Sequence, residues 1–424
     1  MLVQFRVENH RSLRDEQVLS MVASSRGDRG EERLISVAKL ELSLLPAVAI
    51  YGANGSGKTS VLHALAFMCD AVRRSHRSWE PGGGTPRESF ILSNKAADPS
   101  RYEAEFVLDG ARYRYGFLLG ERRVEEEWLF AWPNGRKQSW FTRDGDRFEF
   151  GKNLPGENAA IQAMTRDNSL FLSAAAQNNH PKLLPIYQWF HSLRFELRRN
   201  QAAGLDPWHM AMIEEMLSDS AERPLTAAED AARRRLRDGV LRLLRGADLG
   251  IIDIRLKARE HATRRAGSVE LMFLHRTADG RGMWLPLEAE SAGTIGLVGI
   301  AARLVGVLTR GGVLCVDEFD ASLHPTLVLE LLKLVHDREH NPFGAQLIFT
   351  THDAGLLGTI LGEAPLRRDQ IWFTEKDSFG ATHLYPLMEH SPRKAENLER
   401  GYLQGKYGAI PFLGELLLPP TAGA

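Results

Sequence analysis

The order of apolar and polar positions divides the chain into segments with different expected structures. Residues 44–51 form an apolar run, which predicts a buried strand. Residues 60–68 follow a helical period, and a glycine-rich stretch separates them from the strand. We therefore expect a strand, a tight turn and a helix in direct succession near the N-terminus.

Short alternating runs rich in aromatic residues follow in the second quarter of the chain. The runs 102–108 and 112–117 flank Asp109-Gly110, and an Asp-Gly pair between alternating segments is a strong hairpin signal. Two further runs, 128–132 and 147–150, extend the pattern to a small antiparallel β lobe. Its arginines and aromatic residues suit either a solvated strand face or a surface for nucleic acid.

From residue 181 the pattern is mainly helical, with amphipathic stretches at 208–217 and 227–244. Residues 250–290 suggest strands, and 295–390 alternate helical and strand patterns. These patterns predict an α/β protein with a mostly parallel core sheet, an antiparallel β lobe and a helical insertion. The expected segments are the N-terminal part of the core domain, the β lobe, the helical insertion and the C-terminal part of the core domain, at 1–75, 76–180, 181–250 and 251–424.

Composition and charge narrow the class of protein. The 424 residues are 43% hydrophobic and 25% charged, as in an ordinary globular protein, and the net charge of −1 gives no general attraction to nucleic acid or membranes. Cys69 and Cys315 lie in apolar runs without metal-ligand or disulfide spacing. The first residues lack a signal-peptide pattern, and the longest apolar region, 295–308, is expected to be too short to span a membrane. We therefore expect a cytoplasmic protein with no membrane partner.

A phosphate-binding motif occupies the turn between the first apolar strand and its helix. The pattern GxxxxGK[ST] spans residues 52–59. Its glycines allow backbone N–H groups to curl around phosphate oxygens, and the helix N-terminus adds partial positive charge. Lys58 is expected to reach the β- and γ-phosphates, and the Thr59 hydroxyl to ligate Mg²⁺. The expected nucleotide-binding residues of this segment are Gly52, Ala53, Asn54, Gly55, Ser56, Gly57, Lys58, Thr59 and Ser60.

Two later strands end in polar residues that suit ATP hydrolysis. The run 312–316 ends at Asp317 and Glu318. Asp317 is expected to hold the nucleotide-bound Mg²⁺, and Glu318 to polarise an attacking water. The run 345–351 ends at His352, which is expected to contact the γ-phosphate. Because a helix and a strand fit between these positions, both strand tips should meet at one edge of a parallel sheet.

The order of these motifs resembles the ABC-type ATPases. Within them the chain is similar to the SMC, RecF and OLD branch, which acts on DNA or in phage defence. The resemblance is carried by the phosphate loop, a long insertion, the Asp317-Glu318 strand, the turn at 322–325 and the segment 351–353. It implies an ABC-ATPase (P-loop) sandwich that binds ATP and Mg²⁺.

The resemblance also implies a contact between subunits. In this branch a signature loop contacts the γ-phosphate bound to a second subunit, and Ser291 and Gly293 occupy the matching positions. Ala292 and Thr294 depart from the usual Ser-Gly-Gly-Gln form. The alternative interpretation is an ordinary turn that caps a helix.

Three further residues are assigned through the resemblance. The N-terminal segment 7–13 is similar to the opening strand of this branch, and that implies nucleotide contact by Arg11 or Ser12. Gln177 matches an expected glutamine loop after a strand, where it would ligate Mg²⁺ or water. A surface loop residue is the alternative for Gln177.

Several segments resemble the RloA-like, abortive-infection-type AAA/ABC ATPases of bacterial anti-phage defence. These segments are 112–116, 291–294, 320–325, 397–402 and 405–412. This resemblance implies an ATP-hydrolysing switch that forms a homodimer, or a higher homo-oligomer, around ATP and controls a separately encoded effector such as a nuclease. No nuclease activity is expected in this chain, because the carboxylates after His352 are scattered. The alternative is a RecF- or SMC-like DNA-binding ATPase of repair or recombination, with nucleic acid as the partner.

Overall fold

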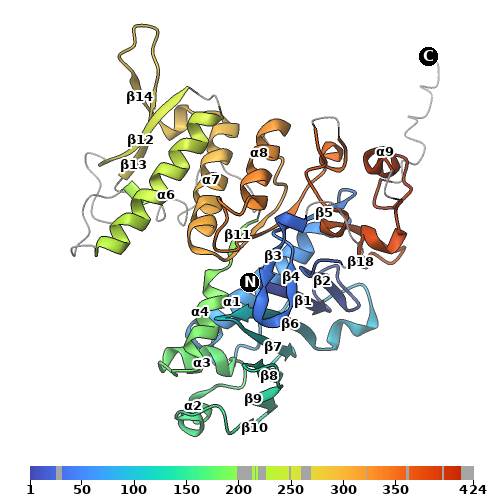
Figure 1. The fold of residues 1–424 in the computed structure, drawn as a ribbon. Coiled ribbons are helices and arrows are strands. Elements are labelled where there is room, and N and C mark those ends of the chain that lie inside the picture. The colour runs from blue at the N-terminus through green and yellow to red at the C-terminus, as the bar shows by residue number, and fades with distance from the viewer. Residues whose placement is uncertain are drawn as a thin grey trace, which may run out of the picture.

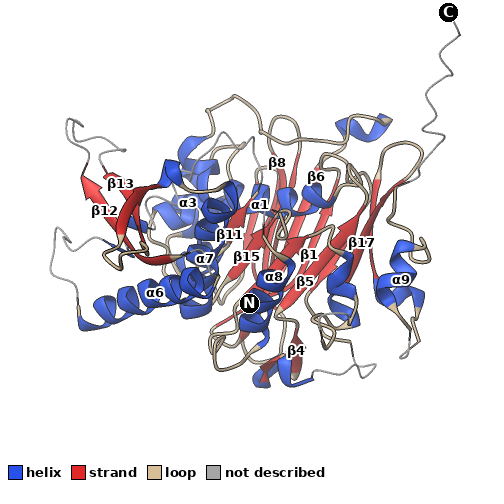
Figure 2. Cartoon of the chain, turned by 90° about the horizontal axis from the view of Figure 1, so that it is seen from above, coloured by secondary structure: helices blue, strands red, loops and turns tan. Residues whose placement is uncertain are grey.

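The computed structural model describes most of the chain (Figure 1). The described residues are 1–24, 31–197, 213–214, 216–217, 226–247, 250–258, 269–321, 323–359, 362–393 and 396–411. Two large sheets lie next to each other, with helices between and around them, as Figure 2 shows from above.

Among the described residues, the core sheet has six strands in the order β11-β15-β16-β5-β17-β18. Their bounds are β5 Ala47–Gly52, β11 Arg194–Glu196, β15 Val313–Val316, β16 Gln346–Thr350, β17 Ile371–Lys376 and β18 Thr382–Pro386. Neighbouring strands are parallel, except that β18 is antiparallel to β17. The carboxyl ends of the parallel strands therefore share one edge, where ligands bind in open α/β sheets.

Alternating side chains of β5 belong to two different cores. The main helices around the core sheet are α1 Lys58–Ser78, α7 Ala292–Arg310 and α8 Pro325–His336. Val48 and Ile50 pack with α1 and the antiparallel sheet, whereas Ala49 and Tyr51 pack with α7 and α8. Because side chains of a strand alternate between its faces and both faces are covered, β5 is a continuous apolar run.

The second sheet, in the described part of the chain, has the strand order β10-β9-β8-β7-β6-β1-β2 and is antiparallel. Its strands are β1 Leu2–Glu8, β2 Gln17–Ser20, β6 Ser100–Leu108, β7 Ala111–Leu119, β8 Val124–Trp132, β9 Gln138–Asp144 and β10 Arg147–Phe150. The expected hairpin at Asp109-Gly110 is present, since Leu108 pairs with Ala111. β1 pairs with β6, so this sheet draws strands from both the 1–75 and the 76–180 segments.

Smaller elements complete the fold. The helices α2 Asn158–Met164, α3 Phe171–Gln177 and α4 Leu184–Ser192 lie around the C-terminal half of α1. A separate group beside α7 contains α6 Ala227–Gly246, β12 Ile251–Ala258, β13 Val269–His275 and β14 Met283–Pro286 (Figure 1). The described part of the chain also contains β3 Ile35–Val37, β4 Leu42–Leu44 and α9 Leu398–Leu403. The 3-10 turns are η1 Glu31–Arg33, η2 Ala38–Leu40, η3 Asn94–Ala97, η4 Leu287–Ala289, η5 Ala354–Leu357, η6 Arg368–Gln370 and η7 Leu387–His390.

The predicted fold class is confirmed. A mostly parallel core sheet, an antiparallel β lobe and flanking helices are all present. The amphipathic stretch expected at 227–244 is helix α6. The helix expected at 208–217 lies largely outside the described residues.

The expectation that the longest apolar region is too short to span a membrane is wrong. This region is part of α7, whose 19 residues are long and apolar enough to cross a membrane by length and composition. The helix is longer than the apolar run because Ser291 caps its start and Gly311 ends it. In the fold 67% of its most apolar window is buried, so the composition of α7 is that of a helix packed in a protein core.

Candidate nucleotide-binding site

The phosphate loop connects β5 to α1 and depends on glycine at two close contacts. Gly57 has a φ of 106°, which is unfavourable for residues with a Cβ atom, and a Cβ there would overlap the Thr382 side chain. A Cβ on Gly52 would overlap the hydroxyl groups of Thr374 and Ser56. The loop backbone is therefore held between β17 and β18 on one side and the start of α1 on the other.

Lys58 is buried at the first turn of α1 and points back into the phosphate loop. Its ammonium group donates to the carbonyl oxygens of Gly52 at 2.8 Å and Ala53 at 3.1 Å. Burial lowers the pKa of Lys58, and the nearby carboxylates of Asp317 and Glu318 partly offset this effect. The cation thus lies between the loop and the acidic strand tip, where phosphate oxygens of a nucleotide would bind.

The structure brings together the two motifs that were expected to hold Mg²⁺. The Thr59 hydroxyl donates to the Asp317 carboxylate, at 2.9 Å from Oδ2 and 3.2 Å from Oδ1. Asp317 is 6% exposed, and its Oδ1 also accepts a hydrogen bond of 2.7 Å from Thr350. A hydroxyl and a carboxylate oxygen fit Mg²⁺, which takes few protein ligands and completes its shell with phosphate oxygens and water.

Glu318 follows Asp317 at the tip of β15 and has an unusual backbone conformation. Its φ is 52°, in the left-handed region, and its backbone N–H donates to Thr350 Oγ1 at 2.7 Å. Thr350 is fully buried at the end of β16, so one hydroxyl bridges both acidic residues. Sequence reasoning missed Thr350: a hydroxyl residue stands out in an otherwise apolar strand, but the sequence does not show that its partners are Asp317 and Glu318.

His352 follows β16 and lies near the same strand tip. β16 is parallel to β15, which places the two strand ends at one edge as expected. Partial burial lowers the pKa of His352, and the positive charge of Lys58 lowers it further, while Asp320 and Glu318 act in the opposite direction. A lowered pKa keeps the imidazole neutral near pH 7, so one ring nitrogen carries a proton for donation.

Hydroxyl groups connect the phosphate loop by hydrogen bonds to Ser12 in the N-terminal segment and to β17 and β18. The Ser12 hydroxyl donates to Ser60 at 2.9 Å, and Thr382 Oγ1 lies 2.8 Å from both the Ser12 hydroxyl and the Ser56 carbonyl oxygen. Ser56 Oγ lies 2.7 Å from Thr374 Oγ1. Ser12 therefore lies beside the loop, and its contact with a nucleotide stays a prediction; Thr374 and Thr382 were not singled out from the sequence.

The other expected loop residues differ in their surroundings. Asn54 and Gly55 are exposed at the outer turn, and a Cβ on Gly55 would meet open space, although its φ of 78° favours glycine. Arg11 also has a left-handed φ, of 51°, and its guanidinium donates to Glu88 at 2.6 Å. The ion pair with Glu88 thus holds the Arg11 side chain at the edge of the site.

Ser291 and Gly293 lie at the start of α7, away from the hydrogen bonds of the phosphate loop. The Ser291 hydroxyl accepts the backbone N–H of Thr294 at 3.1 Å, so this residue caps the helix. α7 packs on β15 and joins it through Gly311 and Gly312, so the two elements run in opposite directions. The helix is roughly 27 Å long and the strand about 13 Å, and Ser291 therefore projects past the strand tip on the side of Asp317.

Gln177 does not lie in a loop after a strand, and that expectation is wrong. It is the exposed last residue of helix α3, whose three consecutive alanines favour a helix. α3 packs at Ser75 and His76, roughly 25 Å along α1 from Lys58. The structure therefore separates Gln177 from the phosphate loop.

The strand that reaches the site from this part of the chain is β11. It is parallel to β15, and the Asp317 backbone N–H donates to the Glu196 carbonyl oxygen at 2.8 Å. The Glu196 carboxylate lies 2.7 Å from the buried Arg303 of α7. Only three residues long, β11 carried too short a pattern to be recognised from the sequence.

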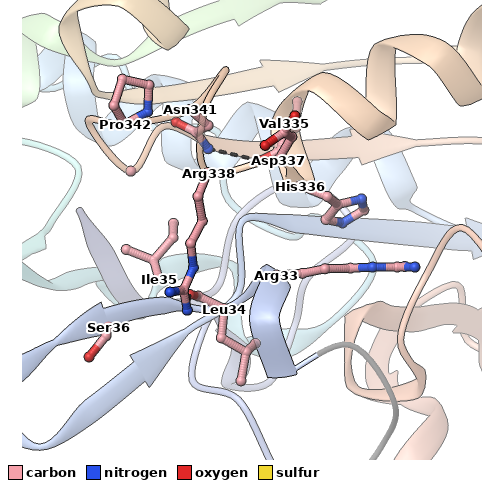
Figure 3. Close-up of a pocket in the computed structure, with 11 residues that line it drawn as sticks. Arg33, Leu34, Ile35, Ser36, Val335, His336, Asp337, Arg338, Asn341 and Pro342 are labelled. Carbon is pink, nitrogen blue, oxygen red and sulfur yellow. Dashed lines mark hydrogen bonds between the residues drawn. The ribbon is translucent and has the colours of Figure 1, made fainter.

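A cavity of about 250 Å³ lies at the opposite edge of the core sheet, where residues 341–344 lead into β16 (Figure 3). Arg33, His336 and Arg338 line it, and Figure 3 shows the two guanidinium groups pointing to different sides. Arg33 donates to two backbone carbonyl oxygens at 3.3 Å, and Arg338 to that of Leu34 at 3.2 Å. These positive groups do not converge on a common ligand position.

Comparison with known families identifies the class of this protein. A family model described as "AAA domain, putative AbiEii toxin, Type IV TA system" matches residues 47–358. The matched range contains the phosphate loop, Asp317, Glu318 and His352. Because it covers most of the chain, the protein belongs to this family of P-loop ATPases.

Solved structures of SMC head domains are also similar to the chain. The SMC head bound to the C-winged helix domain of ScpA is 13% identical, with a TM-score of 0.46. The match covers 90% of this chain and 97% of the SMC head. The SMC head domain from Thermotoga maritima is 13% identical, with a TM-score of 0.39 and coverages of 91% and 98%. The SMC head from Pyrococcus furiosus, with an extended coiled coil and the C-terminal domain of ScpA, is 12% identical, with a TM-score of 0.43 and coverages of 96% and 98%. No curated protein sequence matches the chain.

Proposed function

We propose that the protein is a molecular switch that binds and hydrolyses ATP. The observation that carries this proposal is the pair of hydrogen bonds between the Thr59 hydroxyl and the Asp317 carboxylate, at 2.9 and 3.2 Å. These residues are 258 positions apart and belong to the two motifs that a P-loop ATPase uses to hold nucleotide-bound Mg²⁺. Membership of a P-loop ATPase family supports the same activity.

The residues at the strand tips have separate proposed tasks. Lys58 exchanges its two carbonyl partners for β- and γ-phosphate oxygens, which brings its positive charge onto the substrate. Thr59 and Asp317 would hold Mg²⁺, which would supply positive charge to neutralise the charge that develops on the phosphates. Glu318 accepts a proton from the attacking water, and neutral His352 donates a hydrogen bond to the γ-phosphate.

The active form in this proposal is a head-to-tail homodimer, or a higher homo-oligomer, with ATP between subunits. Ser291 and Gly293 of a second copy would complete each site, as the resemblance to the SMC, RecF and OLD branch implies. Support comes from the position of Ser291, which projects past the strand tips at the start of α7. The same serine that caps α7 therefore also presents this helix N-terminus, with its partial positive charge, to the partner's γ-phosphate.

The proposed role is control of a separately encoded effector, such as a nuclease, in anti-phage defence by abortive infection in the cytoplasm. The family description names a toxin of a toxin–antitoxin system, which supports this setting. The resemblance of several segments to RloA-like ATPases points in the same direction. Closing and opening of the dimer with ATP binding and hydrolysis would report the nucleotide state to the effector.

A RecF- or SMC-like ATPase that binds DNA in repair or recombination is the second candidate. The observation in its favour is a row of arginines over aromatic rings on the outer face of the antiparallel sheet. Arg101 lies 5.2 Å from the Trp128 ring and Arg112 lies 5.1 Å from the Trp132 ring. The same arginines pair with the carboxylates of Glu103 and Glu105, which reduces the positive charge offered to a phosphate backbone. We therefore favour the defence role.

Trapping of an ATP-bound dimer tests the proposed switch. Glu318→Gln should bind ATP without hydrolysing it, so that light scattering at saturating Mg²⁺ATP reports a dimer, whereas the nucleotide-free variant stays smaller. The control is Glu330→Gln, a substitution at an exposed carboxylate on α8. A Glu318→Gln protein that stays monomeric with bound ATP would contradict the clamp.

DNA binding at several salt concentrations separates the two roles. A repair ATPase should bind DNA with an affinity that falls steeply as salt rises, because phosphate contacts release counterions. For the defence role we expect no such binding by the isolated protein. Loss of salt-dependent binding in Arg112→Ala would locate a DNA surface on β7 and favour the second candidate.

A further inference from the structure

The strand order determines which way a bound nucleotide lies across the sheet edge. β5, which leads into the phosphate loop, lies between β16 on one side and β17 on the other. The groups for Mg²⁺ and the γ-phosphate, Asp317 and His352, follow β15 and β16. The γ-phosphate end therefore points towards β15, and the α-phosphate and nucleoside must lie towards β17 and β18. This reasoning rests on the proposed nucleotide site.

Two loops lie on the nucleoside side and are fixed to the phosphate loop. The turn between β17 and β18 leads directly to Thr382, whose hydroxyl contacts the Ser56 carbonyl oxygen at 2.8 Å. The loop before β6 is pinned by the Glu88 carbonyl oxygen, which accepts the Arg11 backbone N–H at 2.7 Å, and by the backbone N–H of Phe90, which donates to Asn9 at 2.9 Å. Both loops are thus held beside the turn that carries Ser12.

These two loops expose large apolar side chains next to each other. Phe379, at the tip of the β17–β18 turn, is 70% exposed, and Ile91 and Leu92 in the other loop are 79% and 66% exposed. The loops touch, since a Cβ on Gly380 would lie 3.0 Å from the Leu92 side chain. Phe90, the neighbour of Ile91, is buried and anchors its loop, so the exposure of the next two residues does not come from a loose segment.

We infer that Phe379, Leu92 and Ile91 form an apolar ledge that receives the base of the nucleotide bound at the phosphate loop. A purine has two apolar faces, and an aromatic side chain in contact with one of them stabilises it by stacking. The ledge lies where the strand order places the nucleoside. An apolar contact there gives affinity for the base, although the three residues form no sequence motif. The ligand class is a purine nucleoside triphosphate, with the base on the ledge and the phosphates in the loop.

Calorimetric titration with Mg²⁺ATP and with Mg²⁺-tripolyphosphate tests the ledge, because only ATP carries a base. Phe379→Ala should weaken ATP binding about 5- to 150-fold, as loss of one stacked base does. Tripolyphosphate binding should stay within about twofold of the wild type, since the phosphate loop is unchanged. Phe379→Tyr keeps the ring and should restore ATP affinity.

The matched control is Phe343→Ala, which removes a 55%-exposed phenylalanine at the opposite edge of the sheet and should leave both affinities unchanged. Equal weakening of ATP and tripolyphosphate by Phe379→Ala, or no weakening of either, would overturn the ledge. So would a Phe379→Ala protein that keeps its ATP affinity but no longer dimerises, since the patch would then be a subunit contact. A wild-type protein that binds neither ligand would instead overturn the nucleotide site itself.

Discussion

At the scale of single residues, the Thr350 hydroxyl is the contact that organises the acidic strand tip. It donates to Asp317 Oδ1 and accepts the Glu318 backbone N–H, both at 2.7 Å. A residue with a side chain keeps a left-handed φ only where its surroundings hold it there, and Glu318 has a φ of 52°. Thr350 therefore sets the direction in which the Glu318 carboxylate points, and we regard it as a positioning residue.

Thr350→Val keeps the shape of the side chain and removes its hydroxyl. We expect kcat for ATP hydrolysis to fall about 10- to 100-fold, because a hydrogen bond to a charged group is worth about 1.5–3 kcal/mol. ATP affinity, measured by titration, should change much less than kcat. Thr350→Ser keeps the hydroxyl and should retain most of the activity; a larger loss in Thr350→Ser than in Thr350→Val would indicate a packing role only.

Residue-level prediction from the sequence is possible where the chemistry is local. Lys58 and Thr59 belong to one continuous motif, and Asp317 ends an apolar strand, so each could be recognised without knowledge of its neighbours. Thr350 and Thr382 could not, because their importance comes from partners far away in the chain. A hydroxyl residue in a strand has no sequence signature for the loop that it will contact.

At the scale of elements, helix α3 is held to the β lobe by a buried carboxylate. Glu127 of β8 accepts the backbone N–H groups of Phe171 and Leu172, at 2.6 and 3.0 Å, and the Tyr115 hydroxyl at 2.9 Å. Arg143, also buried, lies 3.9 Å from the same carboxylate. Burial raises the pKa of Glu127, and Arg143 opposes that shift. This arrangement explains why a helix, and not a loop, begins at Phe171 and runs to Gln177.

Glu127→Ala should strongly destabilise the protein. The substitution leaves the buried Arg143 charge without its counter-ion and two helix N–H groups without their acceptor. Breaking a buried pair in this way costs about 3–5 kcal/mol. Urea unfolding followed by tryptophan fluorescence measures the free energy of unfolding. Glu126→Ala, at an exposed position on the same strand, is the control; an equally small effect at both positions would refute the assigned role of Glu127.

The C-terminal segment also has a structural explanation at this scale. α9 packs on η5, which follows His352, and the Tyr402 ring lies 5.4 Å from that of Tyr51. Tyr407 stacks on Phe373 of β17 with ring centroids 5.9 Å apart. The segment thus supports the strand that leads into the phosphate loop and the turn after His352. Its residues therefore pack beside the elements that hold the phosphate loop.

At the scale of the whole molecule, the layers were predictable and the partition of strands between them was not. The apolar runs and the Asp109-Gly110 hairpin predicted a core sheet and an antiparallel lobe, and both are present. The pairing of β1 with β6 joins segments about one hundred residues apart in sequence, which no local pattern encodes. The three-residue strand β11 reaches the site for the same reason, through pairing and not through propensity.

Buried histidines in both layers make the stability of the whole fold sensitive to acid. Burial lowers the pKa of His10 and that of His336 to about 3, from an ordinary value of 6.5. Between these values the unfolded chain binds protons that the folded protein does not, so the free energy of unfolding must fall as the pH falls below 6.5. The Gln370 side-chain amide lies 3.0 Å from Nε2 of His336, and this contact offsets only part of the lowering of the pKa by burial.

His336→Gln removes one of these protonation sites. The stability advantage of the wild type over this variant should shrink by up to about 1.4 kcal/mol for each pH unit between 6.5 and 4. Chemical denaturation across this pH range measures the difference. The same substitution at the exposed His340 is the control, and a pH-independent difference between the wild type and His336→Gln would contradict the buried neutral state.

Mixing of two inactive variants tests the composite ATP site most directly. Lys58→Ala removes the phosphate-loop cation, and Ser291→Arg blocks the loop offered to the other subunit, so each variant alone should lack ATPase activity. In a mixed dimer one site combines an intact Lys58 with an intact Ser291. An equimolar mixture should therefore recover about a quarter of the wild-type rate, because half of the dimers carry one complete site. No recovery in dimers shown to be mixed, or full activity of Ser291→Arg alone, would contradict a site shared between two subunits.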